Sequence, residues 1–446
     1  MTYIPFTIPR TTRRSVKPNI TSLRIWAVLL AACLLAVFRH AAAAGALTLD
    51  EAFAQALVRS EVVATQGELI RQTEERYRQA NAALLPTLSG IGTYTWLDKG
   101  ASDTKIYPTR QPYARLTGTQ PLFRGFREFA AIRQNQALVD AQGADYQNAR
   151  VQLFKDVAQN FYDVLTLEQD LKNLDEQIQQ YQEREKELQD RVRIGRTRTG
   201  EVLTVQATIS TLRAQVEQVR TQLSTARDIF AFLSGLPATT PLRDTEAVPA
   251  DPGALDAYLA RVALRPDVKA AQRRQVAAQE NIRVARGEHL PSLDLNANRY
   301  LERTGVQQDV EWDVQLALTV PLYAGGGVQS RVREAQSQSE QAELATTRAR
   351  RLADQEIRSF HQTVVLDRSR LAALEKATDA AKSNYKTQRR DYRLGLVTNL
   401  DVLQALSSYL ENQQALDRVR YNVKLNYLRL QAAAVRRPPV PEGTTP

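Results

Sequence analysis

Two long stretches of the chain repeat apolar residues with the heptad spacing of an antiparallel coiled coil. In the first stretch the seam breaks near 195–200 and then resumes, which predicts a helix, a tight turn and a returning helix. A single helix over 126–194 would be about 100 Å long, too long for a compact globule. The second stretch turns near 395–400 and keeps apolar residues every seven positions, at Val402, Tyr409, Leu416, Val423 and Leu430.

The segments between the helices alternate apolar and polar residues, as strands with two different faces do. Every second residue from Trp312 to Val320 is apolar, and most residues between them are polar. Strands of about ten residues can cross a bilayer when tilted, whereas a soluble sandwich would need more than four strands to bury one face. The predicted strands cover about 87–97, 112–121, 292–301 and 310–321. Aromatic residues lie toward their loop ends, as in an interfacial belt: Tyr94, Trp96, Tyr107, Tyr113, Tyr300 and Trp312.

Four strands are too few to close a barrel, and an open sheet edge within lipid leaves backbone groups unpaired. A membrane location would therefore require oligomerisation. Three protomers would contribute twelve strands, and their helical hairpins would continue the barrel as a tube. The predicted fold class is mainly α with a transmembrane β part.

The whole pattern occurs twice, at an offset of about 200 residues. The segment "TQPLFRGFREFAAIRQNQ" at Thr119 returns as "TVPLYAGGGVQSRVREAQ" at Thr319, and the tip "RVRIGRTRTGEVLTVQA" at Arg191 returns as "DYRLGLVTNLDVLQALS" at Asp391. Matching segments in the same order indicate an internal duplication. We therefore predict a first structural repeat over 47–245, a second over 246–434 and a disordered tail over 435–446.

Residues 1–46 have the pattern of a secretory signal peptide: six basic and no acidic residues, an apolar run, and small residues before the cleavage region. The apolar run, Ile25 to Phe38, is too short for a membrane anchor. Without this leader the formal charge of +10 falls to +4, so the sequence gives little support for nucleic-acid binding. The only cysteine, Cys33, also lies in the leader, where "LAAC" leaves lipoprotein processing open as an alternative.

The glycine cluster in "VPLYAGGGVQSRVREAQ" follows a predicted strand and precedes a helix, as a phosphate-binding loop would. The spacing of known nucleotide motifs is absent, and the duplicate "QPLFRGFRE" lacks the cluster. We therefore predict a structural joint, in which proline ends strand pairing and glycine lets the backbone turn into a long helix. The joint residues are Pro121, Gly125, Pro321, Gly325, Gly326 and Gly327.

Nothing in the sequence predicts an enzyme, a cofactor or a metal. His40 lies in the leader, and His289 and His361 have no second histidine or cysteine at metal-ligand spacing. Acidic residues lie on the outer faces of the heptads, and no nucleophile elbow or Walker lysine is found.

The chain resembles the TolC-like outer-membrane factor family over 47–430, through the duplicated order of helix, strand pair and long hairpin and through the joint and tip motifs quoted above. The resemblance implies a homotrimer with a barrel in the lipid of the outer membrane and a helical tunnel through the periplasm. It also implies a closed periplasmic end, which a periplasmic adaptor (a membrane fusion protein) and an inner-membrane pump would open.

The resemblance further implies that contacts between the hairpin tips keep the periplasmic end closed. It assigns a pair to an acidic residue after the first tip glycine, here Glu201, and to a tyrosine before the second, here Tyr392. Relatives also carry an arginine at a position where this chain has Val397, so Arg196 and Arg198 on the first tip are candidate substitutes.

An acidic ring facing the pore would correspond to Asp401, while Gln404 stands where relatives have a second acidic residue, so we expect weaker cation selectivity. In the alternative interpretation, Glu201 and Asp401 are first-turn acidic residues favoured by the helix dipole. The tip residues expected to contact the adaptor are Gly195, Gly200, Gly395 and Leu396.

For function, the resemblance favours type I secretion, because drug-efflux members of the family are often lipoproteins and this leader is that of an ordinary signal peptide. The resemblance further implies a protein toxin of the adenylate cyclase-haemolysin (RTX) kind as cargo. The pump would then be an ABC transporter. A multidrug efflux channel served by a proton-driven pump, with a drug as cargo, is the alternative. A periplasmic coiled-coil adaptor is the alternative from another class, although adaptors carry one hairpin rather than two.

Overall fold

The structure is a computed structural model, and it describes residues 46–98 and 109–436. The predicted leader, with Cys33 and His40, lies outside these residues, as do Tyr107 and residues 437–446 of the predicted tail. The chain divides into two units. In the smaller, Met1–Leu47 with Thr240–Arg243, Leu47 forms a parallel bridge with Leu242. The larger, Thr48–Thr239 with Asp244–Pro446, holds every helix and strand discussed below.

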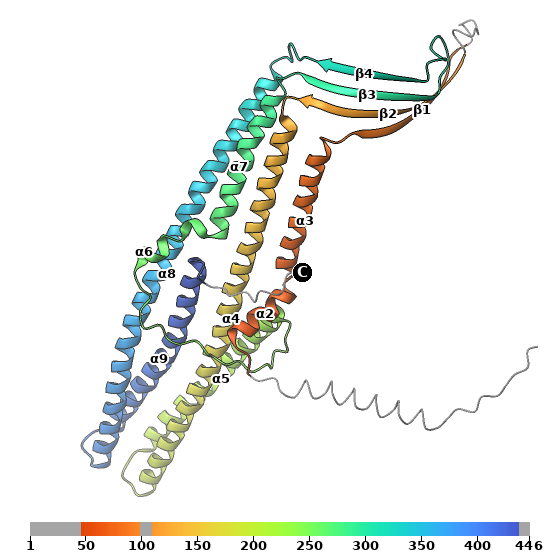
Figure 1. Cartoon of the computed structure of the whole chain (residues 1–446). Coiled ribbons are helices and arrows are strands. Elements are labelled where there is room, and N and C mark those ends of the chain that lie inside the picture. The colour runs from red at the N-terminus through yellow and green to blue at the C-terminus, as the bar shows by residue number, and fades with distance from the viewer. Residues whose placement is uncertain (1–45, 99–108, 437–446) are drawn as a thin grey trace, which may run out of the picture. The chain divides into compact units, whose positions relative to one another are not determined.

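The strands form one antiparallel sheet in the order β1-β2-β3-β4 (Figure 1). Each copy of the duplication supplies one hairpin, and β2 pairs with β3 to join the two copies. The outer strands, β1 and β4, each pair on one side only within the described residues. The strands are β1 (Thr87–Trp96), β2 (Arg110–Arg124), β3 (Ser292–Glu302) and β4 (Trp312–Thr319).

One face of the sheet is apolar and uncovered. The register places Leu295 beside Leu316 and Leu293 beside Leu318 across β3 and β4, and Leu88 of β1 points to the same side. Leu88, Leu316 and Leu318 are each more than 60% exposed, so no part of the described chain packs on this face. The predicted alternation of the strands is therefore present, with its apolar side facing outward from the chain.

The opposite face of the sheet carries a polar ladder that crosses three strands. The Thr117 hydroxyl of β2 donates to Asn298 Oδ1 of β3 at 2.8 Å, and Asn298 Nδ2 donates to Asp313 Oδ1 of β4 at 2.8 Å. One step along, Thr119 donates to Asn296 Oδ1 at 2.8 Å. These bonds fix the register between the two copies, because a one-residue slip would move every polar group to the apolar face.

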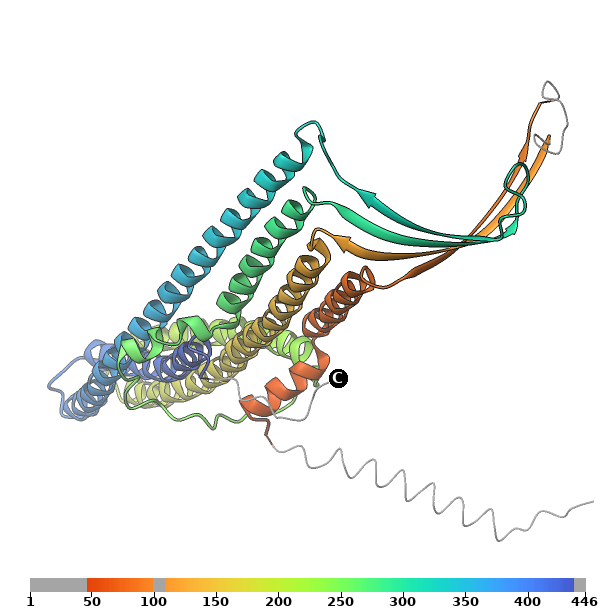
Figure 2. The ribbon, with the colours of Figure 1, turned by 45° about the horizontal axis from the view of Figure 1, so that its top comes forward.

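Helices follow each strand pair, and the longest two have 67 residues each. In both views, α3, α4, α7 and α8 lie side by side in that order, and α4 with α5 and α8 with α9 form antiparallel hairpins (Figures 1 and 2). None of the described helices combines the length and apolar composition needed to span a membrane. The bounds are α2 (Leu49–Arg59), α3 (Glu61–Ala82), α4 (Arg127–Arg193), α5 (Thr199–Ser234), α6 (Leu255–Leu259), the 3-10 helix η1 (Val262–Leu264), α7 (Pro266–Gly287), α8 (Gly327–Arg393) and α9 (Asn399–Ala433).

The predicted heptad seams form the core of the two hairpins. Leu188 of α4 and Val205 of α5 are fully buried, and they belong to one apolar cluster with Val402 and Leu406 of α9. The seam of the first hairpin therefore packs against that of the second. Burial of the seams, more than the helix propensity of each segment, holds helices of this length together.

The prediction that proline ends strand pairing holds at only one of the two joints. Pairing of β4 stops at Thr319, before Pro321. In β2, however, Pro121 lies opposite Asp294 and pairing continues through a bulge as far as Arg124. The prediction for Pro121 is therefore wrong. The bulge lets the strand pass a residue that has no N–H to donate.

At both joints the backbone turns at a glycine, as predicted. Gly125, Gly325 and Gly326 all have positive φ, at 69°, 59° and 79°. Gly327 is already the first residue of α8, and its backbone has no positive φ. In the first copy the position equivalent to Gly326 is Phe126, which adopts the same left-handed conformation with φ 59°.

Candidate functional site at the two hairpin tips

The two hairpin tips have the same backbone structure. At the first tip, Arg196 N–H donates to Arg191 O at 2.8 Å, around Gly195 with φ 66°. At the second, Leu396 N–H donates to the Asp391 carbonyl at 3.0 Å, and Gly395 has φ 77°. Both are Schellman caps, which need a left-handed residue after the helix. Gly195 and Gly395 are thus required by the turn, whereas Gly200 lies inside α5 with no positive φ.

The helices that leave the two tips begin differently. The N-cap of α5 is Arg198, whose side chain makes no capping bond. The N-cap of α9 is Thr398, which forms a capping box with Asp401. The Thr398 hydroxyl donates to Asp401 Oδ2 at 2.6 Å and its N–H donates to the same oxygen at 2.8 Å, and these bonds hold the Asp401 pKa below its usual 3.8. The proposed ring residue is therefore exposed, charged and engaged in a helix cap.

The second tip is held against the last turns of α4 by two arginines. The guanidinium carbon of Arg184 lies 4.0 Å from the centroid of the Tyr392 ring, and that of Arg191 lies 4.3 Å from it. Tyr392 and Arg184 are both buried. Cation–π contacts of this kind are strongest where the cation is desolvated.

Arg184 also binds the start of α9. Its Nε and Nη2 donate to Asn399 Oδ1 at 2.9 and 2.6 Å, and its Nη1 donates to Glu187 Oε2 at 2.9 Å. Asn399 is 5% exposed and Arg184 3% exposed. A buried cation with a carboxylate partner and two further bonds is well satisfied, and removal of either partner would leave a buried polar group unpaired.

The residues predicted to close the tips are not paired with one another in this structure. No hydrogen bond or ion pair joins Glu201 to Tyr392 within the described residues, and Glu201 Oε2 is a buried atom without a hydrogen-bond partner. Arg196 and Arg198 are exposed and form no ion pair in the described part of the chain. The contacts made instead use Arg184, Arg191 and Asn399, which we did not predict. Their signal in the sequence was the seven-residue spacing of the two arginines, which puts both on one face of α4.

Both tips expose large apolar side chains. Ile194, Leu394, Leu396 and Leu400 are each at least 65% exposed. Leu400 lies in the first turn of α9, and the other three lie at or just after the ends of α4 and α8. Four such residues at the two tips exceed the scattered single exposures usual on a surface. This patch contains Leu396, one of the residues predicted to meet an adaptor.

The hairpins are also joined by polar groups further from the tips. Asp170 of α4 is 2% exposed and accepts from Arg418 of α9 at 3.0 Å. Asp417 of α9 in turn accepts from Asn173 of α4 at 3.1 Å. These reciprocal contacts fix the register of the second hairpin on the first.

Comparison with known protein families identifies the family. The outer membrane efflux protein family matches residues 52–235 and 260–434, most of the chain and both copies of the duplication. The chain belongs to this family. The predicted resemblance to TolC-like outer-membrane factors is confirmed, and with it the location in the outer membrane.

The chain is similar to individual proteins in sequence and in structure. It is 31% identical over 171 residues to outer membrane protein TolC of Escherichia coli (strain K12), in an alignment covering 35% of each chain. It is 27% identical over 154 residues to proteases secretion protein PrtF of Dickeya chrysanthemi, covering 33% of each. The chain thus spans about a third of the length of the curated relatives it matches. The outer membrane protein VceC of Vibrio cholerae is similar in structure, with a TM-score of 0.77 at 19% identity over 86% of this chain and 95% of that one.

Proposed function

We propose that this protein is the outer-membrane channel of a tripartite export system and works as a homotrimer. The main support for this proposal is a four-stranded sheet with one uncovered apolar face, joined directly to helices of 67 residues. The apolar face suits lipid, and the polar ladder suits a water-filled lumen. The long hairpins would form the periplasmic tunnel.

The two free edges of the sheet support closure by other copies. Within lipid, unpaired backbone groups along β1 and β4 would each cost several kcal/mol. A second copy could pair its β4 with β1 of the first, and three copies would make a ring of twelve strands. A closed ring leaves no free edge.

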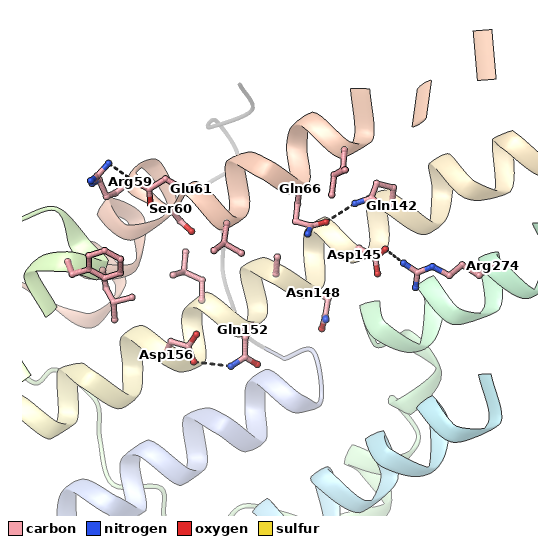
Figure 3. Close-up of a pocket in the computed structure, with 16 residues that line it drawn as sticks. Arg59, Ser60, Glu61, Gln66, Gln142, Asp145, Asn148, Gln152, Asp156 and Arg274 are labelled. Carbon is pink, nitrogen blue, oxygen red and sulfur yellow. Dashed lines mark hydrogen bonds and ion pairs between the residues drawn. The ribbon is translucent and has the colours of Figure 1, made fainter. Parts of the chain in front are cut away.

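The helices offer a matching contact. A groove of about 610 Å³ lies beside α3 and α4, where Gln142 donates to Gln66 and Arg274 pairs with Asp145 (Figure 3). The α4 residues that line it fall within 142–156. Because α8 repeats α4 at an offset of 200, its segment 342–356 would lie at the same level in a neighbour related by rotation.

The facing surfaces are complementary in character. One exposed stripe of α8 combines Leu344 and Leu352 with Arg348. The groove offers exposed Val62 with Glu61 beside it. The apolar side chains of the stripe would then lie against Val62, and Arg348 could join the pair that Glu61 forms with Arg59 at 2.8 Å.

Cysteine cross-linking tests the trimer, since the only natural cysteine lies in the predicted leader. We expect Val62→Cys combined with Leu344→Cys to give a disulfide-linked trimer in outer membranes under oxidation. The control, Val62→Cys with Leu366→Cys, places the second thiol about 33 Å further along α8 and should give none. Equal cross-linking of both pairs, or none of either, would contradict this arrangement.

Membrane extraction and conductance test the channel itself. We expect release from outer membranes by detergent but not by urea, and discrete conductance steps in planar bilayers. Extraction by urea alone would instead indicate a periplasmic adaptor. The exposed apolar tips favour docking of an adaptor there, because a water-facing patch of leucines is stabilised when a partner covers it.

For the cargo, we favour type I protein secretion, with an ABC transporter as pump. A similar protein is named for secretion of proteases. The family name favours drug efflux as the second candidate. A deletion strain separates them: loss of one large secreted protein supports secretion, whereas increased drug susceptibility with an unchanged set of secreted proteins supports efflux.

A further inference from the structure

We propose that the closed periplasmic end of this channel is held through the face of the Tyr392 ring, by an arginine clamp consisting of Arg184, Arg191, Tyr392 and Asn399. This inference rests on the channel function proposed above. It replaces the expected hydrogen bond or ion pair between Tyr392 and Glu201 with a contact from a different helix.

The clamp joins the two copies of the duplication. Arg184 and Arg191 are on α4 of the first copy, whereas Tyr392 is in the last turn of α8 and Asn399 starts α9. Both guanidinium carbons lie within 4.3 Å of the ring centroid. The arginines of α4 therefore contact the residues on both sides of the loop between α8 and α9, Tyr392 before it and Asn399 after it.

The ring face, and not the hydroxyl, makes these contacts. No hydrogen bond involves the Tyr392 hydroxyl in the described residues, and Glu201 Oε2 has no hydrogen-bond partner there. A guanidinium over an aromatic face is attracted by the quadrupole of the ring, which phenylalanine shares with tyrosine. The clamp thus makes a prediction that a hydroxyl latch does not: phenylalanine should replace Tyr392.

Arg184 makes release of the tip costly. It is buried, and it holds Asn399 and Glu187 together with the ring. If the second hairpin moved away from α4, Asn399 and the ring would lose this cation together. Since α4 stays packed on α5 and α7 along its length, the tip of α8 and α9 is the part that would move.

Single-channel conductance of the full-length oligomer in planar bilayers tests the clamp. We expect Tyr392→Leu and Arg184→Ala to favour the open state by about tenfold, the loss expected for desolvated cation–π contacts. Tyr392→Phe and Glu201→Gln should conduct like the wild type. Arg191→Ala, at a half-buried position near the helix end, gives the same test should Arg184→Ala fail to assemble.

Each outcome decides one point. Channels that open in Tyr392→Leu but stay closed in Tyr392→Phe support the clamp. Equal opening of both would show that the hydroxyl is the latch, and wild-type conductance of Tyr392→Leu and Arg191→Ala in intact oligomers would overturn the clamp. If the wild type forms no channel at all, the proposed function fails instead.

Discussion

The joints between strand and long helix have the same left-handed backbone turn in the two copies, but the atoms around the turn differ. In the first, a Cβ on Gly125 would lie 2.2 Å from the carbonyl oxygen of Gly287, at the end of α7. In the second, a Cβ on the equivalent Gly325 would meet none of the described residues beyond its chain neighbours within 4 Å. The left-handed turn is thus present at both joints, but of these two glycines only Gly125 lies against the end of α7.

Alanine substitutions should separate these two requirements and give the largest effect. Gly325→Ala should cost about 1–2 kcal/mol, the penalty for a left-handed alanine. Gly125→Ala adds a clash of the new Cβ with the Gly287 carbonyl oxygen, a backbone atom that cannot turn aside, so we expect little folded protein. Yield and thermal unfolding of the helices, followed by circular dichroism in detergent, provide the measurement. Similar midpoints for the two variants would show that the contact with Gly287 relaxes.

The sequence predicted the turns better than the contacts. The triple glycine at 325–327 predicted a turn at the second joint, yet the closer packing is at the single Gly125. The sequence could not predict this contact, because the neighbour of Gly125, Gly287, is 162 residues away. The bulge that carries Pro121 was missed for a similar reason, since bulges depend on the partner strand.

At the tips, the sequence predicted the features that depend on neighbouring residues in the chain. The cap glycines Gly195 and Gly395 follow from helix termination, and the heptads predicted which faces are buried. The arginine clamp joins residues more than 200 positions apart, so only the packing of α4 against the second tip brings them together. The seven-residue spacing of Arg184 and Arg191 places both on one face of α4, but it does not show which distant residues that face meets.

The capped and uncapped helix starts after the tips should differ by a moderate amount. Thr398→Ala should destabilise the first turn of α9 by about 1 kcal/mol, whereas Arg198→Ala at the start of α5 should have little effect. Because the pKa of Asp401 is lowered by folding, its stabilising effect is present above pH 3.8 and is lost as pH falls through the folded value. Amide hydrogen exchange at the two helix starts, measured against pH, should show acid sensitivity in α9 alone. Unchanged protection of the α9 start in Thr398→Ala would contradict this difference.

The smallest effect should come from exchanging the residues at the helix N-caps of the two joints. Phe126→Gly relieves about 1–2 kcal/mol of left-handed strain. It also removes the edge contact of Phe126 with Phe123, at 5.0 Å between ring centroids, worth about 0.5–1.5 kcal/mol, and gives the unfolded chain more freedom. These terms nearly cancel, so the unfolding midpoint should hardly move. Gly326→Phe should lower it slightly, because Tyr323 stands where Phe123 does in the first copy and can offset part of the strain. A large loss of stability in Phe126→Gly would mean that the aromatic pair, and not the glycine-like backbone, determines how the first strand pair joins α4.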